Sequence, residues 1–291
     1  MNRKRFLQLL TLAPIGVSAM KLNELYNATS DMPDTPLMPA IFFGHGSPMN
    51  AIELNKFTQS WRDIARNLPR PKGILCISAH WETRGTKLTA SSTPKTIHDF
   101  GGFPQALFDV QYPALGSPEL VSSAQEALMP HIAEEDLMWG LDHGTWSVLA
   151  HLFPAADVPV VQLSLDIQKD EQFHFDLGKK LSALRRKGFL VIGSGNMVHN
   201  LGMLAWNKPD SGFDWAIEAN EWFKNAITTE NYNQLTNYRS VSKALQLSIP
   251  TPEHYRPLLY VLGMKQKDER VTFFNDFTTM GSISMTGVML G

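Results

Sequence analysis

Residues 158–192 are VPVVQLSLDIQKDEQFHFDLGKKLSALRRKGFLVI, two short apolar runs on either side of a longer, more polar segment. The runs at 158–163 and 189–192 are rich in valine, leucine and isoleucine and predict buried strands. The segment between them predicts a helix over 171–186, which Gly188 closes. A strand, a helix and a second strand in this order are typical of an α/β fold.

The same alternation continues on both sides of this unit. Apolar runs at 40–43 and 73–77 predict two more buried strands. The other predicted elements are helices over 56–68, 117–128, 213–227, 232–245 and 252–262, and a terminal pair of strands over 271–274 and 282–290. Strands that alternate with helices predict a single α/β domain with a central, mostly parallel sheet and helices on both faces.

Composition excludes several classes of protein. The chain has 291 residues, 43% of them apolar, which is enough for a sizeable buried core. Lysine and arginine total 26 against 28 acidic residues, so the chain lacks the basic surplus of a general nucleic-acid binder. A single cysteine, Cys76, excludes an intrachain disulfide, so any metal site must use histidine or carboxylate ligands. No run of 18 or more apolar residues predicts a transmembrane helix.

The first residues differ in composition from the rest. Arg-Lys-Arg-Phe-Leu at 3–7 precedes a short apolar stretch with a small-residue end at 17–19, which resembles a twin-arginine export leader whose arginine pair is broken by Lys4. A basic amphipathic helix that stays on the protein is the alternative. We therefore expect a leader or linker over 1–37 and a folded domain over 38–291. The two locations that remain open are the cytoplasm and, if the leader functions, the periplasm.

Five of the nine histidines occupy positions that favour a functional role. His45, His80 and His199 follow predicted strands, His143 lies in a loop with a glycine beside it, and His254 begins a predicted helix. Ligands bind outside the carboxyl ends of strands in open α/β sheets, so the three histidines that follow strands could meet at one point. Neutral imidazole is a common metal ligand. For each single histidine the alternative is a hydrogen-bonded structural role, because the spacing matches no local metal motif.

The other four histidines are expected to have other roles. His131 and His174 are predicted to be solvated on or beside helices, and His151 to be structural, whereas His98 could line a pocket. Other catalytic motifs are absent from the sequence. It has no P-loop and no nucleophile elbow, and Val198 replaces the third glycine of a dinucleotide-binding fingerprint.

Six short motifs together resemble the class III extradiol ring-cleavage dioxygenases, and among them the 4,5-DOPA extradiol dioxygenases of bacteria and plants. In order, they are GHGSP at 44–48, SAHW at 78–81, TIHDFGGFP at 96–104, DHGTW at 142–146, GNMVHN at 195–200 and TPEHY at 251–255. The resemblance spans about residues 38–291, which it identifies as the catalytic domain.

The resemblance implies one mononuclear divalent metal ion. His45, His80 and His254 would be its ligands, and His199 would lie at the metal as a base or a fourth ligand. His143 would line the catechol site, so His143 and His199 are the expected catalytic residues. Many members of the class use two histidines and a glutamate, so Glu253 remains the alternative to its neighbour as third ligand. The ion is accordingly Fe(II) or Zn(II).

The function implied is metal-dependent ring opening of a small aromatic catechol such as DOPA, with insertion of both atoms of O₂. Non-haem Fe(II) with open positions supports such chemistry, whereas Zn(II) has no redox chemistry. Two alternatives stay open. One is a zinc-dependent hydrolase that uses the same histidine cluster to activate water. The other is a non-catalytic binding protein on this fold. The expected partners are the catechol and O₂, and the sequence does not specify an oligomeric state.

Overall fold

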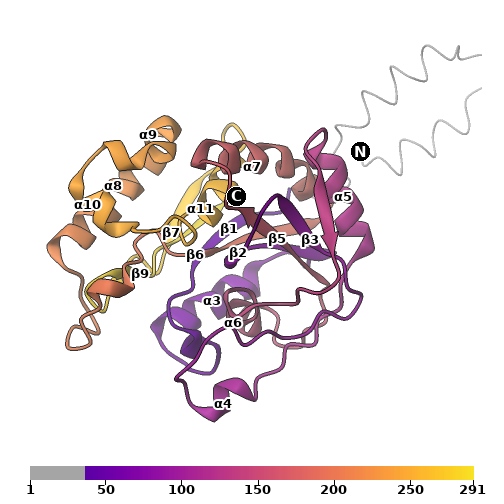
Figure 1. Ribbon diagram of the computed structural model, residues 1–291, viewed down its shortest axis with the longest axis horizontal. Helices are drawn as coiled ribbons and strands as arrows, with labels where there is room; N and C mark the ends of the chain where they lie inside the picture. Colours follow the sequence, from indigo (N-terminus) through magenta and orange to yellow (C-terminus); the bar gives the residue numbers. More distant parts are fainter. Residues whose placement is uncertain (1–36) are drawn as a thin grey trace, which may run out of the picture.

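An eight-stranded sheet forms the centre of residues 37–291, the part of the chain that the computed structural model describes (Figure 1). The strand order is β4-β3-β5-β2-β6-β1-β10-β7. The strands are β1 Ala40–Gly44, β2 Gly73–Thr83, β3 Thr86–Thr89, β4 Ala133–Asp136, β5 Val160–Asp166, β6 Phe189–Gly195, β7 Val271–Phe274 and β10 Gly287–Leu290. Of the predicted leader or linker over 1–37, residues 1–36 lie outside the described part.

The middle of the sheet is parallel. β5, β2, β6 and β1 pair with one another in parallel, whereas β10 pairs antiparallel with β1 and β7, and β3 pairs antiparallel with β5. Every residue of β5 and β6 is buried. Strands covered on both faces need apolar residues on both faces, which explains the unbroken apolar run at 189–192 in β6, whereas β5 also buries polar side chains at Gln162, Ser164 and Asp166. The predicted central, mostly parallel sheet is confirmed.

Helices cover both faces of the sheet. On one face are α3 (Lys56–Asn67), α4 (Gln105–Phe108) and α6 (His143–Leu152), and on the other are α5 (Pro118–Leu128), α7 (Glu171–Arg186), α8 (Asp214–Thr228) and α11 (Arg256–Gly263), as Figure 1 shows for α3 and α6 against α7 and α11. Successive residues of β1 alternate between the two cores. Phe42 packs with the α7 and α11 side, and Phe43 with the α3 and α6 side.

Several predicted boundaries differ from the structure. The single helix predicted over 232–245 is three short elements, α9 (Tyr232–Thr236), the 3₁₀ turn η3 (Tyr238–Ser240) and α10 (Lys243–Ser248). The Ser242 side chain accepts a hydrogen bond from the backbone N–H of Leu245 and so starts a new helix instead of continuing the old one. The strand predicted over 282–290 is likewise divided into β9 (Ile283–Ser284) and β10, and β9 pairs with β8 (Thr278–Thr279).

Among the described helices, none combines the length and apolar character needed to cross a membrane.

The four histidines outside the predicted cluster fall into different environments. His174 is fully buried, with Nδ1 3.1 Å from the Tyr260 hydroxyl, so the prediction that it is solvated was wrong. The reason is tertiary, because α11 packs against the face of α7 that carries it. His131 is half-buried, with Nε2 2.7 Å from Thr86 Oγ1. The structural role of His151 is confirmed, since its Nε2 lies 2.6 Å from the carbonyl oxygen of Asn50.

The burial of His174 predicts a loss of stability in acid. Burial, and secondarily Arg256, lower its pKa to about 3, whereas the unfolded value is about 6.5. Between these values only the unfolded chain binds the proton, so the free energy of unfolding falls as the pH falls, by roughly 1.4 kcal/mol per pH unit from this group. Urea unfolding between pH 6 and pH 5 should show a pH dependence weaker by this amount in His174→Gln. Equal pH dependence in the two proteins would contradict the prediction.

Candidate metal centre

Five histidines meet at one edge of the sheet, where the carboxyl ends of β1, β6 and β2 lie side by side. His45 follows β1 directly, and His199 follows the end of β6. His143 is the first residue of α6, and His254 precedes α11. The sequence placed His80 after its strand, but β2 continues to Thr83 and His80 lies within it. The pairing of β2 with β5 is irregular between Ile77 and Glu82, the stretch that contains His80.

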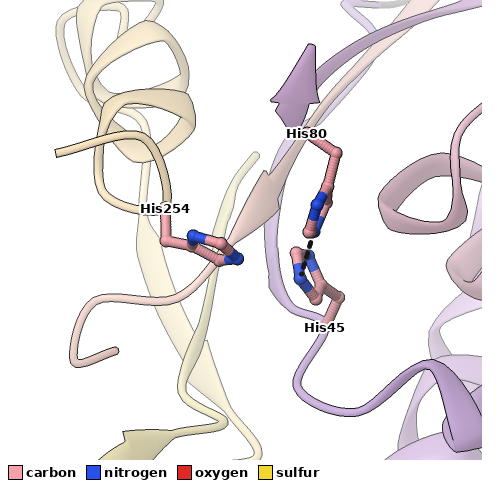
Figure 2. Close-up of side chains that lie close together, drawn as sticks. All are labelled: His45, His80 and His254. Atoms are coloured by element: carbon pink, nitrogen blue, oxygen red, sulfur yellow. Dashed lines mark hydrogen bonds between the residues drawn. The ribbon is translucent and has the colours of Figure 1, made fainter. Parts of the chain in front are cut away.

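Three of these rings surround a common point. Figure 2 shows His80 above His45 with their rings facing each other, and the ring of His254 pointing toward both of them from the left. The Nε2 atoms of His45 and His80 are 3.2 Å apart, and one ring nitrogen from each of the three residues lies within 4.8 Å of the others. The other two rings flank this group. His199 stacks on His254 with ring centroids 3.5 Å apart, and the ring centroids of His143 and His80 are 3.8 Å apart.

An acceptor lies beside Nδ1 of each of the three rings. The Ser194 hydroxyl lies 2.9 Å from Nδ1 of His45, and because it donates its hydrogen to the carbonyl of Gly144, it must accept from the ring. Asp99 Oδ2 lies 3.4 Å from Nδ1 of His80.

Glu253 Oε1 lies 2.9 Å from Nδ1 of His254. Ionised carboxylates only accept hydrogen bonds, so each of the three rings keeps its proton on Nδ1. Each Nε2 is left with a free lone pair, the form in which histidine binds a metal.

Burial keeps these imidazoles neutral. It lowers the pKa of His45 and of His254 well below the usual value, and neighbouring histidines add to the effect. Burial, with His143 next, lowers the pKa of His80 to about 3. Burial likewise lowers the pKa of His199 to about 4, although Glu253 opposes this shift. Neutral rings at pH 7 are ready to bind a cation without first losing a proton.

The donor set fits one divalent metal ion. Two nitrogens each about 2.1 Å from a common ion lie roughly 3.0–3.4 Å apart, depending on the coordination geometry, and the two Nε2 atoms facing each other are at this separation. Of the two candidates for third ligand, His254 groups with His45 and His80. The carboxylate of Glu253 instead contacts His254 and accepts from the hydroxyl of Thr251, and it also lies near His199.

His143 is held at the first turn of α6 by two aspartates. Asp142 caps the helix by accepting from the backbone N–H of Thr145, and it also accepts from Ser78 and Gln162. Asp99 Oδ1 accepts from the backbone N–H of His143, and its Oδ2 lies 2.9 Å from Nδ1 of that ring. Burial would raise the pKa of Asp99, but its contacts with His143 hold the pKa below the usual value.

Asp99 is the site residue that sequence reasoning missed. In the motif at 96–104 the sequence pointed to His98, but Nε2 of His98 lies 3.0 Å from the carbonyl oxygen of Val110, among aromatic rings. The next residue, Asp99, contacts both His80 and His143. The signal available in the sequence was only the presence of a carboxylate within the motif at 96–104.

Two glycines allow the backbone to approach the site closely. A Cβ at Gly144 would lie 2.5 Å from Ser78 Oγ and 2.8 Å from a ring carbon of His80. A Cβ at Gly195 would lie 2.1 Å from the carbonyl oxygen of His254. Any larger residue would therefore displace α6 or the segment that carries His254, which explains glycine at both positions.

Comparisons with known proteins point to one family. A profile described as the catalytic LigB subunit of aromatic ring-opening dioxygenase matches residues 4–290. The 4,5-DOPA dioxygenase extradiol of Escherichia coli (strain K12) is 48% identical over 258 residues, which are 87% of this chain and 95% of that protein. The protein of the same name from Beta vulgaris is 35% identical over 251 residues, 84% of this chain and 92% of that one.

A solved structure shares the fold. The crystal structure of an uncharacterized protein from Escherichia coli K12 matches with a TM-score of 0.77 and 44% sequence identity. The match covers 87% of this chain and 100% of that one. The expected single α/β domain is therefore confirmed by a related structure as well as by the sheet described above.

Proposed function

Because this chain belongs to the family of catalytic LigB subunits of aromatic ring-opening dioxygenases, we propose that its histidine cluster binds one metal ion and opens a catechol ring. The chain is an extradiol catechol ring-opening dioxygenase, an oxidoreductase that uses O₂. Dioxygenases of this family depend on a metal. The hydrolase and the non-catalytic binding protein are not favoured, because the relatives in the comparisons carry the dioxygenase name.

The proposed metal ligands are His45, His80 and His254, with His199 beside them as a base or fourth ligand. The observation that carries this assignment is the acceptor beside each of the three Nδ1 atoms, which leaves three Nε2 lone pairs for one ion. We propose Fe(II) as the ion for ring cleavage, since Fe(II) supplies redox chemistry and open positions, whereas Zn(II) would only bind the catechol. The catalytic domain is proposed to span 38–291.

The two remaining histidines are proposed to move protons. His199 is neutral at pH 7 and stacks on His254, so its free nitrogen is available to take a proton from a catechol hydroxyl. His143 lies beside a different proposed ligand, His80, with its Nδ1 facing Asp99. Its unprotonated Nε2 is then available to take a proton and to return it later in ring opening. Two histidines beside different proposed ligands can serve different steps.

The proposed substrate is a catechol of the DOPA type. Relatives from bacteria and plants carry 4,5-DOPA dioxygenase in their names. On the side of His143, Phe100 lies edge-on to the ring with centroids 5.5 Å apart, and Trp146 packs against Phe100. Trp146 is fully buried, so of these two rings only the half-buried Phe100 is placed to meet the face or edge of a flat catechol ring.

Oxygen dependence tests the function directly. We expect protein loaded with Fe(II) under anaerobic conditions to leave DOPA unchanged until air is admitted, and then to form a yellow ring-opened product. With ¹⁸O₂ the product should carry both labelled atoms. Zn(II)-loaded protein is the matched control and should consume no O₂. Product formation by the zinc form without O₂ would instead support a hydrolase.

A further inference from the structure

One carboxylate oxygen serves two histidines with different proposed roles. Asp99 Oδ2 lies 2.9 Å from Nδ1 of His143 and 3.4 Å from Nδ1 of His80. The other oxygen, Oδ1, accepts from the backbone N–H of His143 at 2.9 Å, which anchors the carboxylate to the start of α6. The centroids of the two rings that Oδ2 faces are only 3.8 Å apart.

No other acceptor in the described residues serves these two Nδ1 atoms. Nδ1 of His143 is buried, and Asp99 Oδ2 lies 2.9 Å from it. The oxygen is not aligned well enough with the ring N–H to form a regular hydrogen bond. The other nitrogen of the His80 ring, Nε2, faces Nε2 of His45 at 3.2 Å, which leaves Asp99 as the acceptor beside Nδ1. Asp99 lies between the two rings and is displaced from ideal alignment with each, as expected for one acceptor shared by two donors.

We propose that Asp99 is a positioning residue that couples the metal ligand His80 to the proton-transferring His143. By facing both Nδ1 atoms, Oδ2 holds both protons on that side of the rings and leaves both Nε2 atoms unprotonated. Metal binding at His80 and proton transfer at His143 therefore depend on the same carboxylate. This inference rests on the proposed function, in which His80 is a ligand and His143 is catalytic.

Asp99→Asn is the sharpest test because it keeps the shape of the side chain and changes only its hydrogen bonding. If the amide oxygen keeps the bond from the backbone N–H of His143, the amide NH₂ faces two Nδ1–H groups. If the amide turns over, NH₂ faces the backbone N–H instead. In either arrangement the NH₂ group faces another hydrogen-bond donor, which is unfavourable. In the first arrangement the conflict ends only when the ring protons move from Nδ1 to Nε2. A proton on Nε2 of His80 blocks the atom that would bind the metal.

Three measurements on the full chain separate the possible roles. Chelator competition should show that Asp99→Asn binds Zn(II) about 10- to 100-fold more weakly, as is typical when the partner of a ligating histidine is removed. With saturating Fe(II) and DOPA, its kcat per bound metal should fall roughly 10²-fold or more, as for loss of an acid–base group. In Zn(II)-loaded protein with ¹⁵N-labelled histidine, NMR should show the His143 proton on Nδ1 in the wild type and on Nε2 in the variant.

Asp109→Asn is the matched control. Asp109 lies in the same part of the chain, is exposed, and its side chain bonds only to that of Gln105 among the described residues. The same chemical change there should leave Zn(II) affinity, kcat and the His143 signal at their wild-type values. Thermal unfolding of both variants should match the wild type, which separates repositioned protons from a damaged fold.

The outcomes distinguish this inference from the proposed function. Weaker Zn(II) binding together with lower kcat per metal and a moved proton supports the coupling. A loss of affinity alone, a loss of kcat alone, or an unmoved His143 proton would overturn it. If His80→Ala loses Zn(II) while Asp99→Asn binds it normally, the inference fails and the ligand assignment stands. If His80→Ala keeps Zn(II) at wild-type affinity, the ligand assignment fails and the inference fails with it.

Discussion

His80→Ala should bind metal roughly 10² to 10⁴ times more weakly than the wild type and should lose ring cleavage at ordinary metal concentrations. The estimate assumes that one of three ligands contributes about a third of the roughly 10–16 kcal/mol measured for complete structural zinc sites. The same loss is expected for His45→Ala and His254→Ala, because each of these rings offers one nitrogen to the same point. Metal analysis after dialysis and chelator competition measure the change.

A suitable control replaces a histidine outside the cluster. His131 is half-buried and contacts Thr86, so His131→Gln should keep one equivalent of metal. A variant of a proposed ligand that binds metal as tightly as the wild type would remove that residue from the ligand set. A crystal structure of the metal-loaded protein gives a second criterion, since a ligand nitrogen more than about 3 Å from the ion is not bound, given Zn–N bonds near 2.1 Å.

His143→Ala and His199→Ala should show the opposite pattern. Each is expected to lower kcat by roughly 10² to 10⁴, the usual contribution of a general acid or base, with much less effect on metal affinity. Steady-state kinetics with DOPA, expressed per bound Fe(II), together with metal content, separate turnover from binding. His199 is the more informative residue, because its stacking on His254 also allows a role as fourth ligand. If His199→Ala lost its metal but kept its turnover per bound metal, His199 would be a ligand and not a base.

The local sequence predicted those features that depend on short segments. The apolar runs at 40–43 and 189–192 became β1 and β6, and the histidines that follow them lie at the predicted edge of the sheet. His254 was different, because a histidine at a helix start has no distinctive spacing. Only the resemblance to a family pointed to it as a ligand, and the structure then brought it to His45 and His80.

The features that could not be predicted depend on contacts between distant segments. His174 is buried because α11 approaches α7 closely, with a Cβ at Gly178 placed 2.3 Å from the carbonyl oxygen of Tyr260. In the loop at 96–104, neither helical nor strand periodicity indicates which of His98 and Asp99 faces the site. The break at Ser242 depends on one side chain accepting a backbone hydrogen bond, which competes with a continuous helical pattern.

The proposed ligands His45 and His254 are far apart along the chain, so they are synthesised at different times. His45 is among the first parts of the folded region to leave the ribosome, and His254 is among the last. At about 5–20 residues per second, His254 is synthesised roughly ten to forty seconds after His45. A nascent chain therefore cannot assemble the three-nitrogen set until α11 begins to form. With the proposed ligand set, the ion would therefore bind only to a nearly complete chain, and the iron and zinc available to that chain would influence which form accumulates.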